Sequence, residues 1–168
     1  MEQEQVFTKL ITENQGIIHK VCNIYCKNEG DRADLFQEIV LQLWKSYGSF
    51  QGRSKISTWM YRIALNTAIT SFRKQKKNKV QQQLSLQEFQ IPDIYPDEDF
   101  EEKLAALYQA IRQLSKVERA VIMLYLEDKS YQEMAEILGI SESNVGVKLN
   151  RVKKKLKKII KPELYGVK

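Results

Sequence analysis

The sequence predicts an all-α protein built from two small helical domains that are joined by an extended acidic linker. Apolar residues recur at helical spacing from Phe7 to Phe72 and again from Leu104 onward. Neither stretch shows the alternation of apolar and polar residues that is typical of β-strands. Pro92 and Pro96 lie between the two stretches, in a segment that is rich in acids and has no helical stripe. The change in composition therefore divides a chain whose length alone suggests one domain.

These changes of composition set the expected domain boundaries. We expect a first domain at 1–78, a linker at 79–101, a second domain at 102–161 and a tail at 162–168. The segments also differ in charge, within a net charge of +6. Residues 62–79 hold six bases and no acid, residues 88–102 hold seven acids and no base, and residues 141–161 hold eight bases against one acid. Two basic blocks around an acidic one suggest two contacts with nucleic acid.

In the first domain we expect four helices. The first spans about 4–28, and its core side comprises Phe7, Leu10, Ile11, Ile18, Val21 and Tyr25. Asp31 is the expected cap of the second helix, about 32–47. The last helix begins near Ser57, after the loop sequence YGSFQGRSK, which is compatible with a short helix or an irregular turn.

The second domain begins with an amphipathic helix from Leu104 to Leu114. Two S-x-x-E capping boxes, Ser115 with Glu118 and Ser130 with Glu133, then predict the starts of two further helices. We expect Gly139 to end the second of these and Ser141 to cap the last helix.

The last helix has one apolar side and one basic side. Its predicted core stripe comprises Val145, Leu149, Val152, Leu156 and Ile159. Asn144, Lys148, Asn150 and Arg151 fall outside that stripe and are expected to project outward. This pattern is typical of a helix-turn-helix, whose second helix enters the DNA major groove. A surface helical hairpin with a solvated lysine face is the alternative.

Two groups of polar and aromatic residues mark the first domain. Asp34, Gln37, Glu38 and Trp44 lie on or beside an otherwise apolar helix, where they suit contact with a basic helix of another protein or form a solvated face. In the second group, aromatic residues that can stack on unpaired bases alternate with cations that can hold phosphates. Core packing is the alternative for its Trp59 and Tyr61. The second group comprises Phe50, Trp59, Tyr61, Arg53, Lys55, Arg62 and Arg73.

Other functions have less support in the sequence. A single His, no glycine-rich phosphate loop and no clustered acids on a structured element argue against an enzyme, and we expect no cofactor. His19, Cys22 and Cys26 share one helix face, where packing is favoured over a metal or redox role, and we expect no metal site. The sequence shows no signal peptide and no apolar run of membrane-spanning length, so we expect a cytoplasmic protein without membrane insertion.

The order of the motifs resembles an extracytoplasmic-function (ECF) sigma factor of bacterial RNA polymerase. DLFQEIVLQLW, FQGRSKISTWMYRIALNTA, an acidic segment and SYQEMAEILGISESNV follow one another from about Phe7 to Ile160. The resemblance implies an alternative sigma factor that binds core polymerase, directs promoter-specific initiation and assists strand opening. It also implies docking on the β′ clamp helices through Asp34, Gln37, Glu38 and Trp44, binding of the second domain to the β flap, and control by an anti-sigma factor.

The resemblance also assigns residues to promoter DNA. The loop 48–55 would capture a base flipped from the −10 element, the helix after it would hold the opened strand, and the linker would thread the polymerase channels. The −10 residues would be Phe50, Gln51, Arg53, Ser54, Trp59, Tyr61, Arg62 and Asn66. The −35 residues would be Ser143, Asn144, Val147, Lys148, Asn150, Arg151 and Lys154.

One departure from the family lies in the last helix. Gly146 and Val147 stand where relatives often carry a basic or small polar pair, and Gly146 costs about 1 kcal/mol of helix propensity relative to Ala. Close approach of the backbone or an altered −35 preference would explain it. The alternative function is a stand-alone helix-turn-helix regulator, but that class needs a dimerisation or ligand-sensing domain, which the first segment does not resemble.

Overall fold

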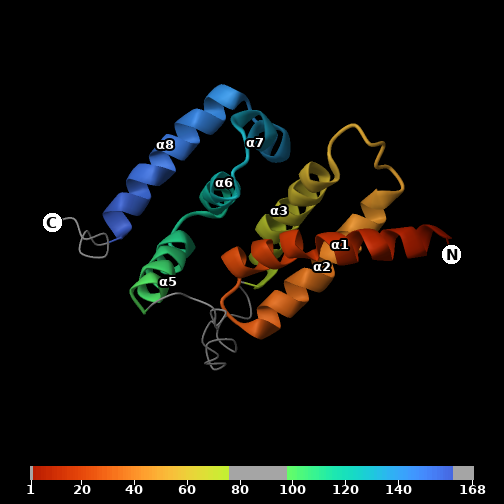
Figure 1. Ribbon diagram of the computed structural model, residues 1–168, viewed down its shortest axis with the longest axis horizontal. Coiled ribbons are helices and arrows are strands. Elements are labelled where there is room, and N and C mark those ends of the chain that lie inside the picture. The colour runs from red at the N-terminus through yellow and green to blue at the C-terminus, as the bar shows by residue number, and fades with distance from the viewer. Residues whose placement is uncertain (1, 76–97, 161–168) are drawn as a thin grey trace. The chain divides into compact units, whose positions relative to one another are not determined.

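The computed structural model describes residues 2–75 and 98–160, and these residues form helices joined by short connections, without a strand (Figure 1). The all-α expectation is therefore confirmed. The chain divides into two compact units, Met1–Glu88 and Phe89–Lys168. The predicted linker falls mostly outside the described residues, as does the tail. Helix α5 begins at Glu98, so the last residues assigned to the linker, 98–101, are helical.

Unit 1 contains three helical segments in its described part. They are α1 (Glu2–Tyr25), α2 (Glu29–Tyr47) and α3 (Ile56–Gln75), and each packs on the other two. Residues 48–55 form turns and bends, which is the irregular-turn alternative for this loop, and the expected four helices are present because α1 is itself two helices merged across a kink at Asn14. The largest side chains with no exposed surface in the unit are Ile18, Val21, Ile39, Leu43 and Met60.

The junction between α1 and α2 differs from the prediction in its cap. Asn28, not Asp31, caps α2: its side-chain oxygen accepts a hydrogen bond from the Asp31 backbone N–H at 2.7 Å. Asp31 lies in the first turn instead, where its carboxylate accepts from the Asn28 amide at 3.0 Å. Helix α1 ends at Tyr25, three residues before its predicted end.

Helix α1 is interrupted near its middle. Asn14 has non-helical dihedral angles (φ −119°, ψ 16°), and its side-chain amide donates to the Leu10 carbonyl at 2.9 Å. Leu10 and Ile11, which were predicted to be buried, are half-buried next to this kink. A side-chain amide that hydrogen-bonds a carbonyl of the preceding turn is a common cause of such a bend.

Unit 2 contains α5 (Glu98–Arg112), α6 (Lys116–Leu126), α7 (Tyr131–Leu138) and α8 (Glu142–Ile159), and α8 packs on the other three. Both predicted capping boxes are present, at the starts of α6 and α7. Gly139 ends α7 with φ +71°, and Ser141 caps α8. The predicted helix-turn-helix is confirmed in each of these details.

The apolar side of α8 forms much of the core of unit 2. Val145, Leu149, Val152 and Leu156 are buried as predicted, whereas Ile159 is half-buried and Ile160 is buried in its place. Because these four residues recur every three or four positions, they fix the rotation of α8 about its own axis. The opposite side of the helix therefore faces outward.

Replacing each of two glycines of the helix-turn-helix by alanine should change the stability of unit 2 in opposite directions. Gly139→Ala should destabilise unit 2 by about 1 kcal/mol, because an alanine is strained at φ +71°. Gly146→Ala should stabilise it by up to about 1 kcal/mol through helix propensity. The new Cβ would lie 3.4 Å from Tyr131 Cε2, which is an ordinary contact. Amide hydrogen exchange in α7 and α8 measures both effects, and equal shifts for the two variants would contradict this account of the turn.

Candidate nucleic-acid and protein interfaces

Helix α2 presents a mixed acidic and apolar surface on the side away from its core. Leu35, Ile39 and Leu43 are buried at intervals of four residues, which turns the remaining face outward. Glu38 on that face is half-buried and accepts a hydrogen bond from Gln42 at 3.1 Å. We call this surface the α2 face, and its residues are Asp34, Gln37, Glu38, Leu41 and Trp44.

Leu41 is a member of the α2 face that the acidic motif in the sequence does not reveal. Its side chain is 44% exposed, and it lies three residues after Glu38 and three before Trp44. Leu41 belongs to neither the acidic motif nor the core stripe, so its apolar character alone does not reveal its position. A helical wheel oriented by the buried positions of α2 places Leu41 on the outward side, beside Glu38.

Trp44 is held in place by an aromatic contact with α1. Its ring is 38% exposed and packs edge-on against Phe7, with 5.0 Å between the ring centroids and 61° between the planes. Phe7 also lies 5.3 Å from the ring of Tyr47. The exposed indole therefore has a fixed orientation at the end of the α2 face, as an anchor in a protein interface requires.

The loop 48–55 is tied to the core of unit 1 by aromatic packing. The ring of Phe50 lies 4.8 Å from that of Trp59 at a tilt of 31°, and Trp59 in turn lies 6.3 Å from Tyr47. Gly52 adopts φ +70°, which allows the loop to turn sharply. Gln51 and Arg53 are exposed there, whereas Phe50 and Ser54 are half-buried.

Two residues that the sequence assigned to −10 DNA lie in the core instead. Trp59 is 9% exposed and Tyr61 is 2% exposed, so core packing accounts for both. Tyr61 therefore has too little exposed surface to stack on a base. Arg62 and Asn66, by contrast, are exposed one turn apart on α3, opposite Ala64 in the core.

The outward side of α8 carries most of the residues assigned to −35 DNA. Val147 is 48% exposed and lies two residues from buried Val145 and Leu149, which places it on the opposite side of the helix. Lys148 is half-buried. The exposed residues of this side, which we call the α8 face, are Ser143, Asn144, Val147, Asn150, Arg151 and Lys154.

The structure divides the lysine run that follows on α8. The ammonium group of Lys153 lies over the ring of Tyr125, 4.1 Å from its centroid, and Lys155 forms an ion pair with Glu118 at 3.0 Å. Lys154 and Lys157 are exposed. Lys153 and Lys155 therefore stabilise the packing of α8 on α6.

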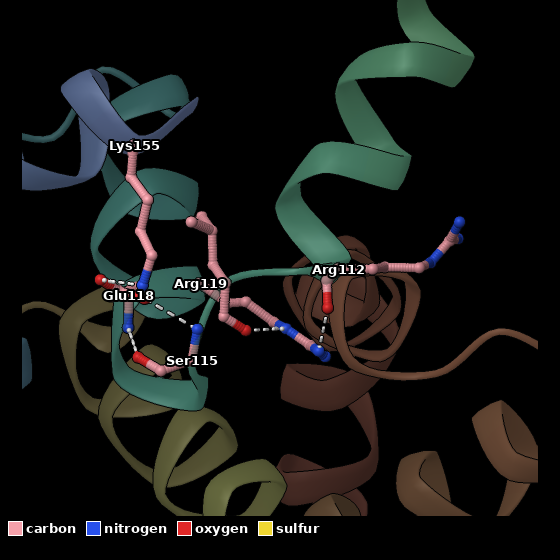
Figure 2. A network of polar contacts seen from close by, with 6 residues as sticks. Arg112, Ser115, Glu118, Arg119 and Lys155 are labelled. Atoms are coloured by element: carbon pink, nitrogen blue, oxygen red, sulfur yellow. Dashed lines mark hydrogen bonds and ion pairs between the residues drawn. The ribbon is translucent and has the colours of Figure 1, made fainter. Parts of the chain in front are cut away.

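The ion pair belongs to a polar network at the start of α6. Figure 2 shows Lys155 reaching from α8 to Glu118, which also completes the capping box with Ser115. Arg119 donates to the carbonyls of Arg112 and Leu114 and so satisfies the end of α5. Burial raises the pKa of Glu118, but its hydrogen bonds to Ser115 and Lys155 and the charge of Lys155 together leave it below the ordinary value of 4.5.

A shallow cleft of about 280 Å³ lies between α8 and the start of α6. Its charged lining includes the side chains of Lys148, Arg151 and Lys155, with Glu118 opposite them. Because Lys155 is paired with Glu118, Lys148 and Arg151 give this flank of the α8 face its positive charge.

Packing accounts for the group of His19, Cys22 and Cys26. Both cysteines are buried, while His19 is exposed and lies 4.8 Å from the ring of Phe36. Burial raises the pKa of the Cys22 thiol to about 12, and the charge of Arg32 lowers it by less. Cys22 therefore stays protonated at neutral pH, which argues against a reactive thiol.

Comparison with known proteins assigns both units to one family. The family description "Sigma-70 region 2" matches residues 10–78, and "Sigma-70, region 4" matches residues 104–156. The ECF RNA polymerase sigma factor SigX of Bacillus subtilis is 31% identical over 164 residues, which cover 92% of this chain and 84% of that protein. The chain belongs to the ECF sigma factors.

Further relatives agree with this assignment. The RNA polymerase sigma factor SigV of Bacillus subtilis is 29% identical to this sigma factor, with 86% of this chain and 84% of SigV covered. Among solved structures, CnrH in complex with the cytosolic domain of CnrY has a TM-score of 0.66 at 19% identity, covering 93% of this chain and 88% of CnrH. The sigma factor RpoE of Bartonella quintana, in complex with the anti-sigma factor NepR, has a TM-score of 0.63 at 19% identity, covering 94% and 96%.

The two family matches coincide with the two sets of exposed residues. The α2 face, the loop 48–55 and the exposed side of α3 lie in the region 2 match, and the α8 face lies in the region 4 match. As a sigma factor, the protein directs RNA polymerase to promoters. Among its described helices, none has both the length and the apolarity that a membrane crossing requires.

The Glu118–Lys155 pair predicts a small pH dependence in unit 2. Since the folded pKa of Glu118 is depressed, the pair should stabilise the unit above about pH 4.5 and lose this effect as the pH falls through the folded pKa. Glu118→Gln should remove that component, worth less than about 1 kcal/mol because the pair is partly exposed. Amide hydrogen exchange in α6 and α8 across pH measures it, with Glu101→Gln on α5 as the control. A variant that retains the wild-type pH profile would contradict the role of the pair.

Proposed function

We propose that this sigma factor grips core RNA polymerase with the α2 face, holds the opened −10 strand with the loop 48–55 and the exposed side of α3, and reads the −35 element with the α8 face. The observation that supports this most strongly is the presence of both sigma regions in one chain, each with an exposed polar face on a rigid helix. The two contacts with DNA give promoter specificity, and the contact with polymerase delivers the enzyme to the promoter.

The chemistry of the α2 face suits a basic helical partner. Asp34 and Glu38 supply negative charge one turn apart, and Leu41 and Trp44 supply apolar area beside them. In protein interfaces, aromatic anchors provide much of the affinity and charges provide orientation. The β′ clamp helices are the partner that the family resemblance implies.

The −10 contact would be built from the exposed residues of the loop and α3. Arg53 and Arg62 can hold phosphates, while Gln51 and Asn66 can hydrogen-bond to the edges of unpaired bases. Trp59 supports the loop from below by packing on Phe50. A base flipped into the loop would meet the outer side of Phe50, because Trp59 covers its inner side.

On the α8 face, some residues would reach the base edges of the −35 element and others would reach only its phosphates. Asn150 and Arg151 lie at the middle of the 18-residue helix, nearer than Lys154 and Lys157 to the N-terminal end from which a recognition helix brings side chains to base edges in the major groove. Lys154 and Lys157 follow further along and would meet phosphates, which position the helix without specifying sequence. Arg151 is the candidate for a guanine contact.

The remaining expectations follow from the same assignment. The protein would act in the cytoplasm as an initiation factor without catalysis, cofactor or metal of its own, and the β flap would hold unit 2. RpoE of Bartonella quintana was solved with an anti-sigma factor, and we propose a partner of that class here. The stand-alone regulator gains no support, since residues 10–78 match sigma region 2.

Charge reversal on the α2 face tests the proposed function. Glu38→Lys or Asp34→Lys should abolish binding to core polymerase and promoter-dependent transcription while leaving helicity intact, because each places like charge against a basic surface at a cost of several kcal/mol. Pull-down of core polymerase and run-off transcription from a cognate promoter measure the two losses.

The matched control is Glu13→Lys, which makes the same charge change at an exposed position on α1. It should bind core polymerase as the wild type does. Equal losses for all three variants would point to net charge rather than the α2 face, and full binding by Glu38→Lys would remove the face from the interface.

A second pair of variants should separate strand opening from duplex recognition. Asn66→Ala on α3 should reduce opening of the −10 region and leave affinity for duplex −35 DNA unchanged, since Asn66 lies in unit 1. Asn150→Ala on α8 should weaken duplex −35 binding and leave opening of the −10 region normal at saturating holoenzyme. Permanganate reactivity of promoter thymines and holoenzyme binding to −35 duplexes measure the two steps. If either variant affects both steps alike, the division of labour between the units is wrong.

A further inference from the structure

Val147 is an apolar residue in the middle of a polar DNA-reading surface. Its side chain is 48% exposed. Its neighbours one turn away on the α8 face are Ser143, Asn144, Asn150 and Arg151, all polar. An exposed valine on this face adds nothing to the core, which Val145 and Leu149 serve from the other side of the helix.

The side chains on one flank of Val147 are short. Gly146 precedes it, and Ser143 and Asn150 lie one turn before and after it. The longer side chains of Lys148 and Arg151 lie on the other flank, beside the cleft at the start of α6. A valine reaches only a short distance from its helix, so it can touch a base only where the backbone comes close, and the short flank permits such an approach.

The ring of Tyr131 explains why a glycine at 146 is compatible with the fold. A Cβ at position 146 would meet Tyr131 Cε2 at 3.4 Å, so the ring at the start of α7 already covers this point of α8. The missing side chain therefore leaves no gap, because the partly exposed ring of Tyr131 fills the space next to Gly146.

We propose that Val147 reads the C5-methyl group of a thymine in the −35 element. In the major groove, thymine is the unmodified base that presents a methyl group, and contact with that methyl is the way an apolar side chain distinguishes bases. This inference rests on the proposed function, because it assumes that α8 enters the groove. It also explains the departure of Gly146 and Val147 from the basic or small polar pair of relatives as a shift from hydrogen-bond readout to methyl readout.

The test uses the holoenzyme of the full chain with core polymerase. A duplex library randomised in the −35 region is first selected for binding, and each thymine of the selected element is then replaced singly by deoxyuridine, which lacks only the methyl. At one position the wild-type protein should bind about fourfold more weakly to uracil, as burial of one methyl group predicts. Val147→Ala should bind thymine and uracil equally there.

Two controls isolate the methyl contact. Val6→Ala makes the same truncation at an exposed valine in unit 1 and should keep the wild-type ratio of thymine to uracil binding. A duplex with 5-methylcytosine at the sensitive position separates recognition of the methyl from recognition of thymine as a whole. It should recover part of the affinity lost with cytosine in the wild type and none in Val147→Ala.

The possible outcomes distinguish methyl recognition by Val147 from the proposed recognition of the −35 element by α8. If a −35 sequence is selected but no thymine is sensitive to loss of its methyl, or if Val147→Ala keeps the sensitivity, Val147 does not read a methyl although α8 still binds the element. If the holoenzyme selects no −35 sequence at all, both the inference and the proposed −35 recognition fail.

Discussion

Burial of one apolar side of each helix is the constraint from which the candidate interfaces follow. On α2, Leu35, Ile39 and Leu43 enter the core and turn the acidic and aromatic face outward. On α8, the stripe from Val145 to Leu156 does the same for the α8 face. Because apolar burial supplies most of the stability of such small units, neither helix can rotate to hide its outer face without losing its core. The fold therefore determines which positions of α2 and α8 face outward, and the residues at those positions determine which partner each face can bind.

A series of aromatic contacts ties the α2 face and the loop 48–55 of unit 1 to one another. Trp44 packs on Phe7, Phe7 on Tyr47, Tyr47 on Trp59, and Trp59 on Phe50. The α2 face and the loop 48–55 thus share a rigid support, although the residues that would touch each partner differ. Ring contacts of this kind hold orientation as well as burying area. In unit 2, the capping boxes and the Glu118–Lys155 pair serve the same purpose by setting α8 against α6.

The helices and most of their caps could be predicted from sequence, because capping boxes and apolar stripes are local signals. Both S-x-x-E boxes and the left-handed Gly139 were identified correctly, whereas Asn28 was overlooked because Asp31 offered an equally good local cap. Burial of Trp59 and Tyr61 could not be decided locally, since an aromatic residue beside cations suits a core as well as a stacking surface. The exposure of Leu41 could not be predicted from its apolar character, because it depends on which other residues of α2 are buried in the core. The division of the lysine run likewise depends on Glu118, which is 37 residues away from Lys155.

Photo-crosslinking from single positions tests most directly the claim that one-sided burial assigns each face to its partner. A photoreactive residue would replace Leu41 in one variant and Val147 in another, and each would be assembled with core polymerase and promoter DNA. The account predicts that position 41 crosslinks to polymerase and not to DNA, and that position 147 crosslinks to the −35 duplex. Crosslinks to the opposite partner from either position, or from position 147 to DNA outside the −35 element, would contradict it.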